Sequence, residues 1–178
     1  LESVLAAKGA GAVDYSSETG KTVLHMDIGG GTSNLALIRE GKIVKTGCLN
    51  VGGRLIKVEA GRINYVSPVL QALGVPAELS QVETIAGLLT EALEMAAGLR
   101  KKTQLFDHLW TQEAGAPFAV PRAKMPVFSF SGGVADCIET QQEDLAFGDI
   151  GPMLGRAIRK SRLCAGAYRL GEQTIRAT

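Results

Sequence analysis

Aromatic side chains are scarce in this sequence, and charge of neither sign dominates it. Phe, Trp and Tyr make up 5% of the 178 residues, so the chain offers little surface for stacking nucleic-acid bases. The 19 basic and 18 acidic residues leave a formal net charge of +1, which gives no global field to attract nucleic acid or an anionic membrane. The composition therefore argues against nucleic acid as a partner.

Long apolar runs and regular cysteine spacings are also missing. No apolar stretch approaches the roughly 20 residues of a membrane-spanning helix, so we expect no membrane span. Cys48, Cys137 and Cys164 are far apart with no C-x-x-C spacing, which favours reduced thiols over a metal site or a disulfide framework. The absence of G-x-x-x-x-G-K-[ST] and of G-x-G-x-x-G argues against a P-loop and weakens a Rossmann interpretation.

The segment 22–38 is the most informative part of the chain. An apolar run leads into Asp27, three consecutive glycines follow, and Thr32, Ser33 and Asn34 open a second apolar run. This order predicts a strand, a glycine turn and a second strand. Glycines let backbone N–H groups approach a bulky anion, and such a row of donors forms a nest suited to phosphate. The simpler alternative is a glycine hairpin turn that binds nothing.

A second glycine turn occurs at Gly132 and Gly133, directly after a predicted strand and Ser131. A helix is predicted over 134–142, so its free N–H groups and positive dipole end would lie beside this turn. A nucleotide can approach a backbone of this kind. The alternative is a tight strand-to-helix turn without a ligand.

The remaining pattern predicts an α/β chain. Residues 22–66 are interpreted as one continuous meander of five strands, because turn residues separate its short apolar runs. Apolar residues at helical spacing predict an amphipathic helix over 81–102, opened by a Ser80/Glu83 capping box and closed by a basic cluster. The other predicted elements are a helix tail over 1–10, polar turns over 12–20, a short helix over 103–110, a strand over 125–130, a helix over 151–164 and a possible strand start over 168–178.

The two glycine turns, about a hundred residues apart, resemble the nucleotide site of the actin/Hsp70/hexokinase ATPase superfamily. DIGGGTSN (27–34) is similar to the second phosphate loop of that superfamily, and FSGGVAD (130–136) to its adenosine loop. Together with ESVLAAKGAGA (2–12) and CLNVGGRLI (48–56), these motifs resemble, in order, the EutA family of ethanolamine ammonia-lyase reactivating factors.

The resemblance implies an actin-like ATPase (ribonuclease H-like) fold, with a mixed five-stranded sheet and flanking helices. Residues 1–178 would form most of the second lobe of a two-lobed protein. Its parts would be the strands and phosphate loop over 22–66, a helical insertion over 78–110 and the adenosine-loop segment over 125–178. No D-x-G-T turn of a first phosphate loop occurs in 1–26 and both ends look cut, so we expect a fragment with half of the nucleotide clamp.

The resemblance also implies roles for individual residues. Asp27 would be the catalytic carboxylate and would hold Mg²⁺ through a bound water. Gly132 and Gly133, with Ser131, would line the adenosine side. Asp136 would either reach the ribose or would cap a helix or stay in solvent, without contacting the nucleotide. The expected ligands of the β- and γ-phosphates are the backbones of Gly29, Gly30 and Gly31 and the hydroxyls of Thr32 and Ser33.

The implied function is an ATP-dependent, chaperone-like reactivase. With ATP and Mg²⁺ it would loosen ethanolamine ammonia-lyase, so that intact cobalamin coenzyme replaces damaged cofactor in ethanolamine utilisation. The fragment alone is expected to be inactive. The expected location is cytoplasmic, and association with a bacterial microcompartment is left open.

Two other functions would use the same glycine turns. A small-molecule kinase, of the sugar or acetate type, would add a substrate-binding acid in the other lobe. An actin-like filament or scaffold protein would add long exposed apolar edges, which the sequence does not indicate. Both stay open as alternatives to the reactivase.

Overall fold

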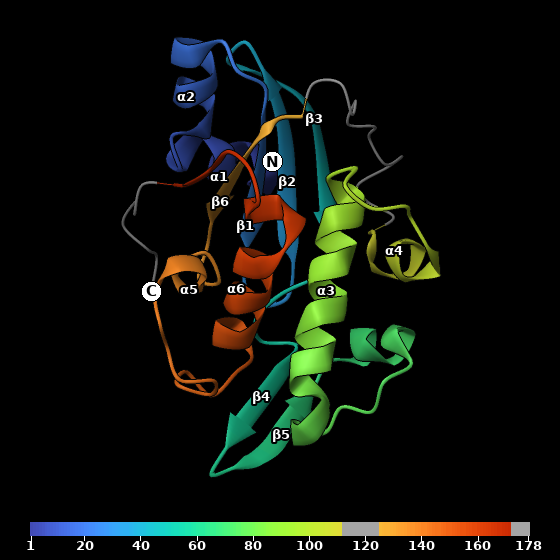
Figure 1. Cartoon of the computed structure of the whole chain (residues 1–178). Helices are drawn as coiled ribbons and strands as arrows, with labels where there is room; N and C mark the ends of the chain where they lie inside the picture. The colour runs from blue at the N-terminus through green and yellow to red at the C-terminus, as the bar shows by residue number, and fades with distance from the viewer. Residues whose placement is uncertain (112–124, 172–178) are drawn as a thin grey trace.

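A mixed five-stranded sheet forms the centre of the computed structural model, which describes residues 1–111 and 125–171 (Figure 1). Its strands are β1 (Val23–Ile28), β2 (Ser33–Arg39), β3 (Lys42–Leu49), β6 (Val127–Ser131) and β7 (Tyr168–Leu170). β1, β2 and β3 form an antiparallel meander, whereas β6 runs parallel to β1 and β7 runs parallel to β6. The spatial order is therefore β3-β2-β1-β6-β7.

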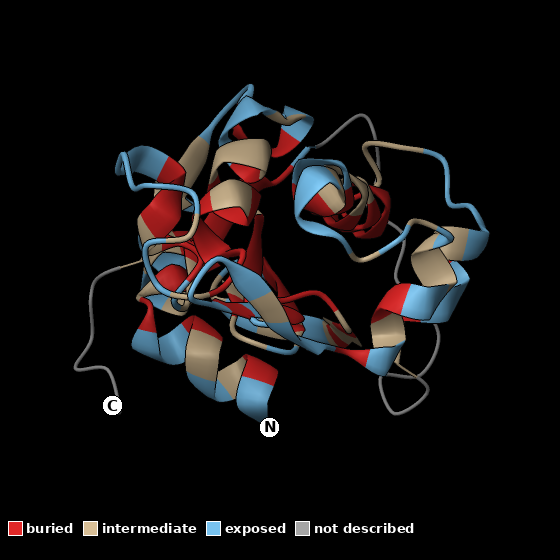
Figure 2. Ribbon diagram, turned by 90° about the horizontal axis from the view of Figure 1, so that it is seen from below, coloured by how far each residue is buried: buried red, intermediate tan, exposed pale blue. Residues whose placement is uncertain are grey.

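Helices cover both faces of this sheet (Figures 1 and 2). The described helices are α1 (Glu2–Gly9), α2 (Ala12–Thr19), α3 (Val82–Ala96), α4 (Gln104–Leu109), α5 (Asp136–Glu139) and α6 (Gly151–Lys160). α1 and α2 pack on one face through a small cluster that includes Ala7 and Ala12. α3 and α6 pack on the other face in the main core, where the larger apolar side chains lie.

Strand alternation decides which side chains of β1 reach the main core. Leu24, Met26 and Ile28 are fully buried there, beneath α3 and α6. Because neighbouring side chains of a strand point to opposite faces, His25 and Asp27 lie on the face that α1 and α2 cover. The sheet thus places Asp27 at the end of β1, on the same face as the last residues of α1.

The strands predicted over 22–66 are all present, but the single meander is wrong. β4 (Ile56–Glu59) and β5 (Arg62–Val66) pair with each other in a separate two-stranded sheet. The chain leaves the main sheet at Gly52 and Gly53, and the N–H groups of Gly53 and Arg54 donate to the first glycine turn instead of extending a strand. The predicted turn at Ala60-Gly61 is confirmed.

The long helix was predicted correctly in kind but not in extent. α3 begins at Val82 with no side-chain cap, so the Ser80/Glu83 capping box does not form. It ends at Ala96 because Gly98 adopts a left-handed conformation, with φ of 76°. The Leu99 N–H then donates to the Glu94 carbonyl at 2.9 Å, which completes a Schellman ending. The basic cluster 100–102 therefore lies beyond the helix.

Three further predictions are corrected by the structure. Residues 12–20 form α2 rather than turns, because the left-handed Gly11 and Gly20 bracket a helical segment whose buried positions are small. The helix predicted over 134–142 is only the single turn α5, and the one predicted over 151–164 ends at Lys160 before a short 3₁₀ turn. The short helix predicted over 103–110 and the strand predicted over 125–130 are confirmed as α4 and β6.

Candidate nucleotide site

A cleft of about 930 Å³ opens where β1 and β6 end, which is within the usual size of small-molecule sites. Both glycine turns line it, together with the end of α1, the loop between β3 and β4, and the start of α6. The predicted site residues that line it are Asp27, Gly29, Gly30, Ser131, Gly132, Gly133 and Asp136. Gly31, Thr32 and Ser33 are not among its lining residues.

The triple-glycine turn is held by its own backbone and by the loop that follows β3. The Gly29 N–H donates to the Thr32 carbonyl at 3.0 Å, which closes the hairpin. The carbonyls of Gly29 and Gly30 accept from the N–H groups of Gly53 and Arg54 at 2.9 and 2.8 Å. Within the described residues, no hydrogen bond occupies the N–H of Gly30, so this donor at the cleft wall is available to an anion.

The hydroxyl of Ser33 does not fit the phosphate role predicted for it. Ser33 is fully buried and donates to the Val51 carbonyl at 2.7 Å. This bond ties the start of β2 to the loop after β3, so the side chain is part of the scaffold behind the turn. Thr32 contributes the carbonyl that closes the hairpin, and the role of its hydroxyl stays a prediction.

Gly132 is the residue that brings the second turn close to the first. Its φ is +90°, and a Cβ there would lie 2.5 Å from the Ile28 carbonyl oxygen and 3.0 Å from Asp27 Oδ1. Only glycine fits both the backbone conformation and the space. The predicted helix dipole beside this turn is weak, because α5 has only four residues.

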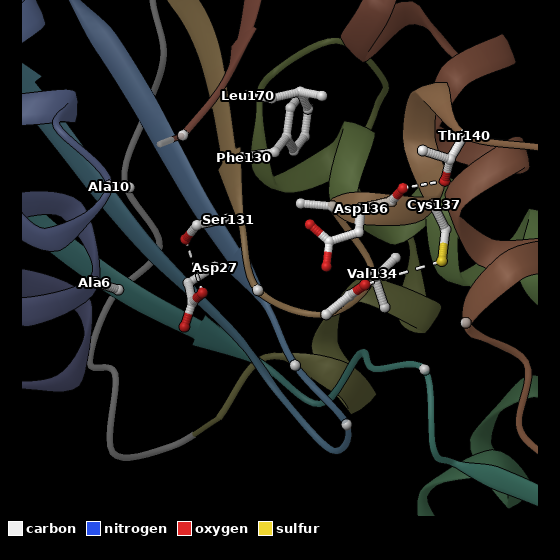
Figure 3. A pocket seen from close by; sticks show the side chains of 18 of the residues that line it. Ala6, Ala10, Asp27, Phe130, Ser131, Val134, Asp136, Cys137, Thr140 and Leu170 are labelled. Carbon is white, nitrogen blue, oxygen red and sulfur yellow. Dashed lines mark hydrogen bonds between the residues drawn. The ribbon is translucent and has the colours of Figure 1, made fainter. Parts of the chain in front are cut away.

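Asp27 is held in place from the strand beside it. β1 and β6 pair in parallel with Asp27 opposite Ser131, and the Ser131 hydroxyl donates to Asp27 Oδ1 at 2.8 Å. Figure 3 shows these two side chains on one side of the cleft and Asp136, Cys137 and Thr140 on the other. The predicted catalytic carboxylate therefore has one oxygen fixed by the protein.

His25 continues the hydrogen bonding away from the cleft. Its Nε2 lies 2.8 Å from Ser131 Oγ and its Nδ1 lies 2.8 Å from Ser129 Oγ. Arg169 in turn donates from Nη1 to Ser129 Oγ at 2.9 Å. Burial, and secondly the charge of Arg169, lower the pKa of His25 from 6.5 to about 3. The imidazole is therefore neutral at physiological pH, as expected of a structural histidine rather than a charged ligand.

This low pKa predicts that the protein loses stability in mild acid. The unfolded chain protonates His25 near pH 6.5 but the folded chain only near pH 3, so the stabilisation is complete above pH 6.5 and falls as the pH drops toward 3. From this group we expect the free energy of unfolding to fall by about 2 kcal/mol between pH 7 and pH 5, measured by urea unfolding. His25→Gln should remove that part of the pH dependence, and the exposed control His108→Gln should keep it. Identical pH profiles for His25→Gln and the parent would contradict the assignment.

Arg54 and Asp149 are site residues that the sequence reasoning missed. Arg54 lines the cleft beside Gly30, with its side chain largely exposed and its Nε 3.5 Å from Asp149 Oδ2. Asp149 is buried, and its Oδ1 accepts from the N–H of Gly151 at the start of α6. An arginine at the rim of a glycine turn is suited to a phosphate oxygen. The only sequence signal for Arg54 was its place directly after Gly52-Gly53.

The described residues fit a nucleotide better than a metal bound by protein alone. Within residues 1–111 and 125–171, no group of three His, Cys, Asp or Glu side chains could hold a metal ion. A single carboxylate, Asp27, suits Mg²⁺ that keeps its waters and is bound mainly by phosphates. None of the helices in the described part of the chain is long and apolar enough to cross a membrane.

Comparison with known proteins agrees with the motifs. The model of a family described as "Ethanolamine utilisation protein EutA" matches residues 1–178. A Salmonella typhimurium protein named "Ethanolamine ammonia-lyase reactivase EutA" is 37% identical over 195 aligned positions, and an Escherichia coli protein of the same name is 37% identical over 194. Each alignment covers 100% of this chain and 40% of the relative, so the chain spans about two fifths of their length.

Proposed function

The chain belongs to the EutA family of ethanolamine utilisation proteins, and we propose that the complete protein is an ATP-dependent reactivase of ethanolamine ammonia-lyase. The names of the two curated relatives support this activity and this partner. The proposed location is the cytoplasm, where the client enzyme would be met. The single observation that carries the nucleotide part is the shared cleft, into which both glycine turns and Asp27 converge.

The fold supports an actin-like lobe. A mixed five-stranded sheet lies between two helical layers, and the cleft opens at the ends of its two central parallel strands. Ligands of open α/β sheets bind at such strand ends. We therefore propose that the nucleotide lies across the two glycine turns, with a second lobe closing over it.

The residues of the cleft suit phosphoryl chemistry. ATP with Mg²⁺ would supply the transferable phosphoryl group and most of the charge neutralisation. The Gly30 N–H would bind a phosphate oxygen, and Arg54 would balance negative charge at the rim. Asp27, fixed through Oδ1, would orient a water with its other oxygen. Gly132 leaves the space that lets the two turns approach each other.

The proposal predicts release of damaged cofactor that depends on hydrolysis. Ethanolamine ammonia-lyase holding inactive cobalamin is mixed with the complete protein, Mg²⁺ and ATP, and released cobalamin and regained lyase activity are measured. We expect release with ATP and at least about tenfold less with a non-hydrolysable analogue, because in the proposed cycle the lobes close on ATP and hydrolysis is needed to change their angle again. Equal release without nucleotide would contradict the proposal. A phosphorylated small molecule in a substrate screen would instead favour the kinase, and light scattering that rises with ATP would favour the filament protein.

A further inference from the structure

We infer that His25 is a positioning residue for Asp27: held as the Nε2–H tautomer, it directs the Ser131 hydroxyl onto Asp27 Oδ1 and leaves Oδ2 for the cleft. The inference deepens the proposed function, because it states how the carboxylate of that site is oriented. It concerns a row of polar side chains on the α1/α2 face of the sheet, which we call the polar row: Arg169, Ser129, His25, Ser131 and Asp27.

The sheet register builds the polar row. In the parallel pairs, His25 lies opposite Ser129 and Asp27 lies opposite Ser131, and on the next strand Arg169 lies opposite Ser129. All five side chains alternate with residues of the main core and so share the other face. His25 and Ser129 are fully buried. A buried row of this kind is stable only when each of its groups finds a hydrogen-bond partner.

The direction of each hydrogen bond in the polar row follows from the residues at its two ends, Asp27 and Arg169, because one can only accept and the other can only donate. The Asp27 carboxylate only accepts, so the single proton of Ser131 is used on Oδ1. His25 Nε2, at 2.8 Å from the same hydroxyl oxygen, must then be the donor. At the other end Arg169 only donates, and it donates to Ser129 Oγ. The Ser129 proton is left for His25 Nδ1, which must be the acceptor.

One neutral tautomer therefore satisfies every contact of the polar row. The Nδ1–H tautomer would leave His25 Nε2 and Asp27 Oδ1 competing for the single hydroxyl proton of Ser131. It would also point the Nδ1 proton at a serine that already accepts from Arg169. An imidazolium would place a second cation near the guanidinium. Because the proton order runs without a break from a cation to an anion, the polar row connects Asp27 on β1 to Arg169 on β7, two strands away.

The remote end of the polar row is itself anchored. Arg169 also donates from Nη2 to the Ala10 carbonyl at 3.2 Å, at the end of α1. Its guanidinium lies over the ring of Tyr15 on α2, 5.2 Å from the centroid. The corner between α1 and α2 thus holds the arginine, which supplies the donor at this end of the polar row. Among the described residues no donor reaches Asp27 Oδ2, so that oxygen is available to a bound water.

Nitrogen NMR of ring-labelled histidine in the complete protein tests the tautomer without any nucleotide. The expected result for His25 is a protonated Nε2 and a bare Nδ1, with the resonance assigned by its loss in His25→Gln. Arg169→Met alone should keep this tautomer, because the Asp27 end still requires Nε2 to donate, whereas Arg169→Met combined with Ser131→Ala should abolish the single tautomer. A protonated Nδ1, an imidazolium, or an unchanged spectrum in the double variant would overturn the inference. Failure of the complete protein to hydrolyse ATP would instead overturn the proposed function, and the spectrum would still decide the tautomer.

Steady-state kinetics of ATP hydrolysis distinguish a positioning role of His25 from a role in packing alone. His25→Leu and Ser131→Ala should each lower kcat for ATP hydrolysis about tenfold or more while the KM for ATP changes less than about twofold, since the water and not the nucleotide is misplaced. His25→Gln keeps one donor and one acceptor and should recover most of kcat. Equal losses in His25→Leu and His25→Gln, or a loss carried mainly by KM, would contradict positioning. Thermal unfolding of each variant confirms that a folded protein was assayed.

Discussion

Replacing Asp27 by asparagine is expected to lower the rate of ATP hydrolysis by the complete protein about 100-fold or more. The amide keeps the shape of the side chain and an oxygen that can accept from Ser131, but it removes the negative charge that would orient a metal-bound water. Folding should be unaffected, because Asp27 is only half buried at the end of β1. Steady-state phosphate release under saturating ATP measures the effect.

A matched control separates this loss from a general effect of removing a carboxylate. Asp107→Asn changes an exposed aspartate on α4, outside the cleft, and should leave both hydrolysis and unfolding unchanged. Nucleotide affinity should be retained in Asp27→Asn, since the glycine backbone is intact. Normal turnover in Asp27→Asn would show that another group performs the chemistry.

Replacing Gly52 by alanine is expected to destabilise the protein by about 3 kcal/mol, at the upper end of the usual range for overpacking. A Cβ on Gly52 would lie 2.2 Å from the Gly30 carbonyl oxygen and 2.7 Å from the Gly31 nitrogen. These are backbone atoms of the turn that lines the cleft, so no flexible side chain can move aside. The turn must shift, and ATP affinity should fall with stability. Urea unfolding and equilibrium nucleotide binding measure the two effects.

Gly31→Ala is the natural comparison for Gly52→Ala. A Cβ on Gly31 meets nothing within 4 Å, and the residue is exposed. Its free energy of unfolding should stay within about 0.5 kcal/mol of the parent. If both alanine variants were equally stable, the close approach of the loop to the turn would be wrong.

The central strands and both glycine turns were predictable, because each depends on a few neighbouring residues. Alternating and continuous apolar runs, interrupted by glycine, are local signals. The end of α3 was mispredicted although Gly98 supplies a local signal, because the apolar spacing continues past it to Leu99. The separate sheet of β4 and β5 depends instead on contacts of Gly53 with a turn more than twenty residues away, which no local pattern contains.

The candidate site was predictable only where residues of suitable chemistry are also neighbours in the sequence. Asp27 and the glycines occur in recognisable order, and the structure brings them to one cleft. Ser33 was misassigned because its residue type suits phosphate, whereas alternation buries its hydroxyl behind the turn. His25, Ser129 and Arg169 are distant in sequence, so their row follows only from the parallel register of β1, β6 and β7.

Backbone hydrogen bonds around Gly53 connect the cleft wall to the segment that leads into the β4–β5 hairpin. The Gly53 N–H donates to the Gly29 carbonyl. The Gly53 carbonyl accepts from the N–H of Ile150, just before α6, at 2.9 Å. Lys57 and Asp149 are bridged close by, on the arm of the same hairpin. The β4–β5 hairpin and the first glycine turn are therefore connected through backbone hydrogen bonds, so a displacement of the hairpin would be expected to move the turn as well.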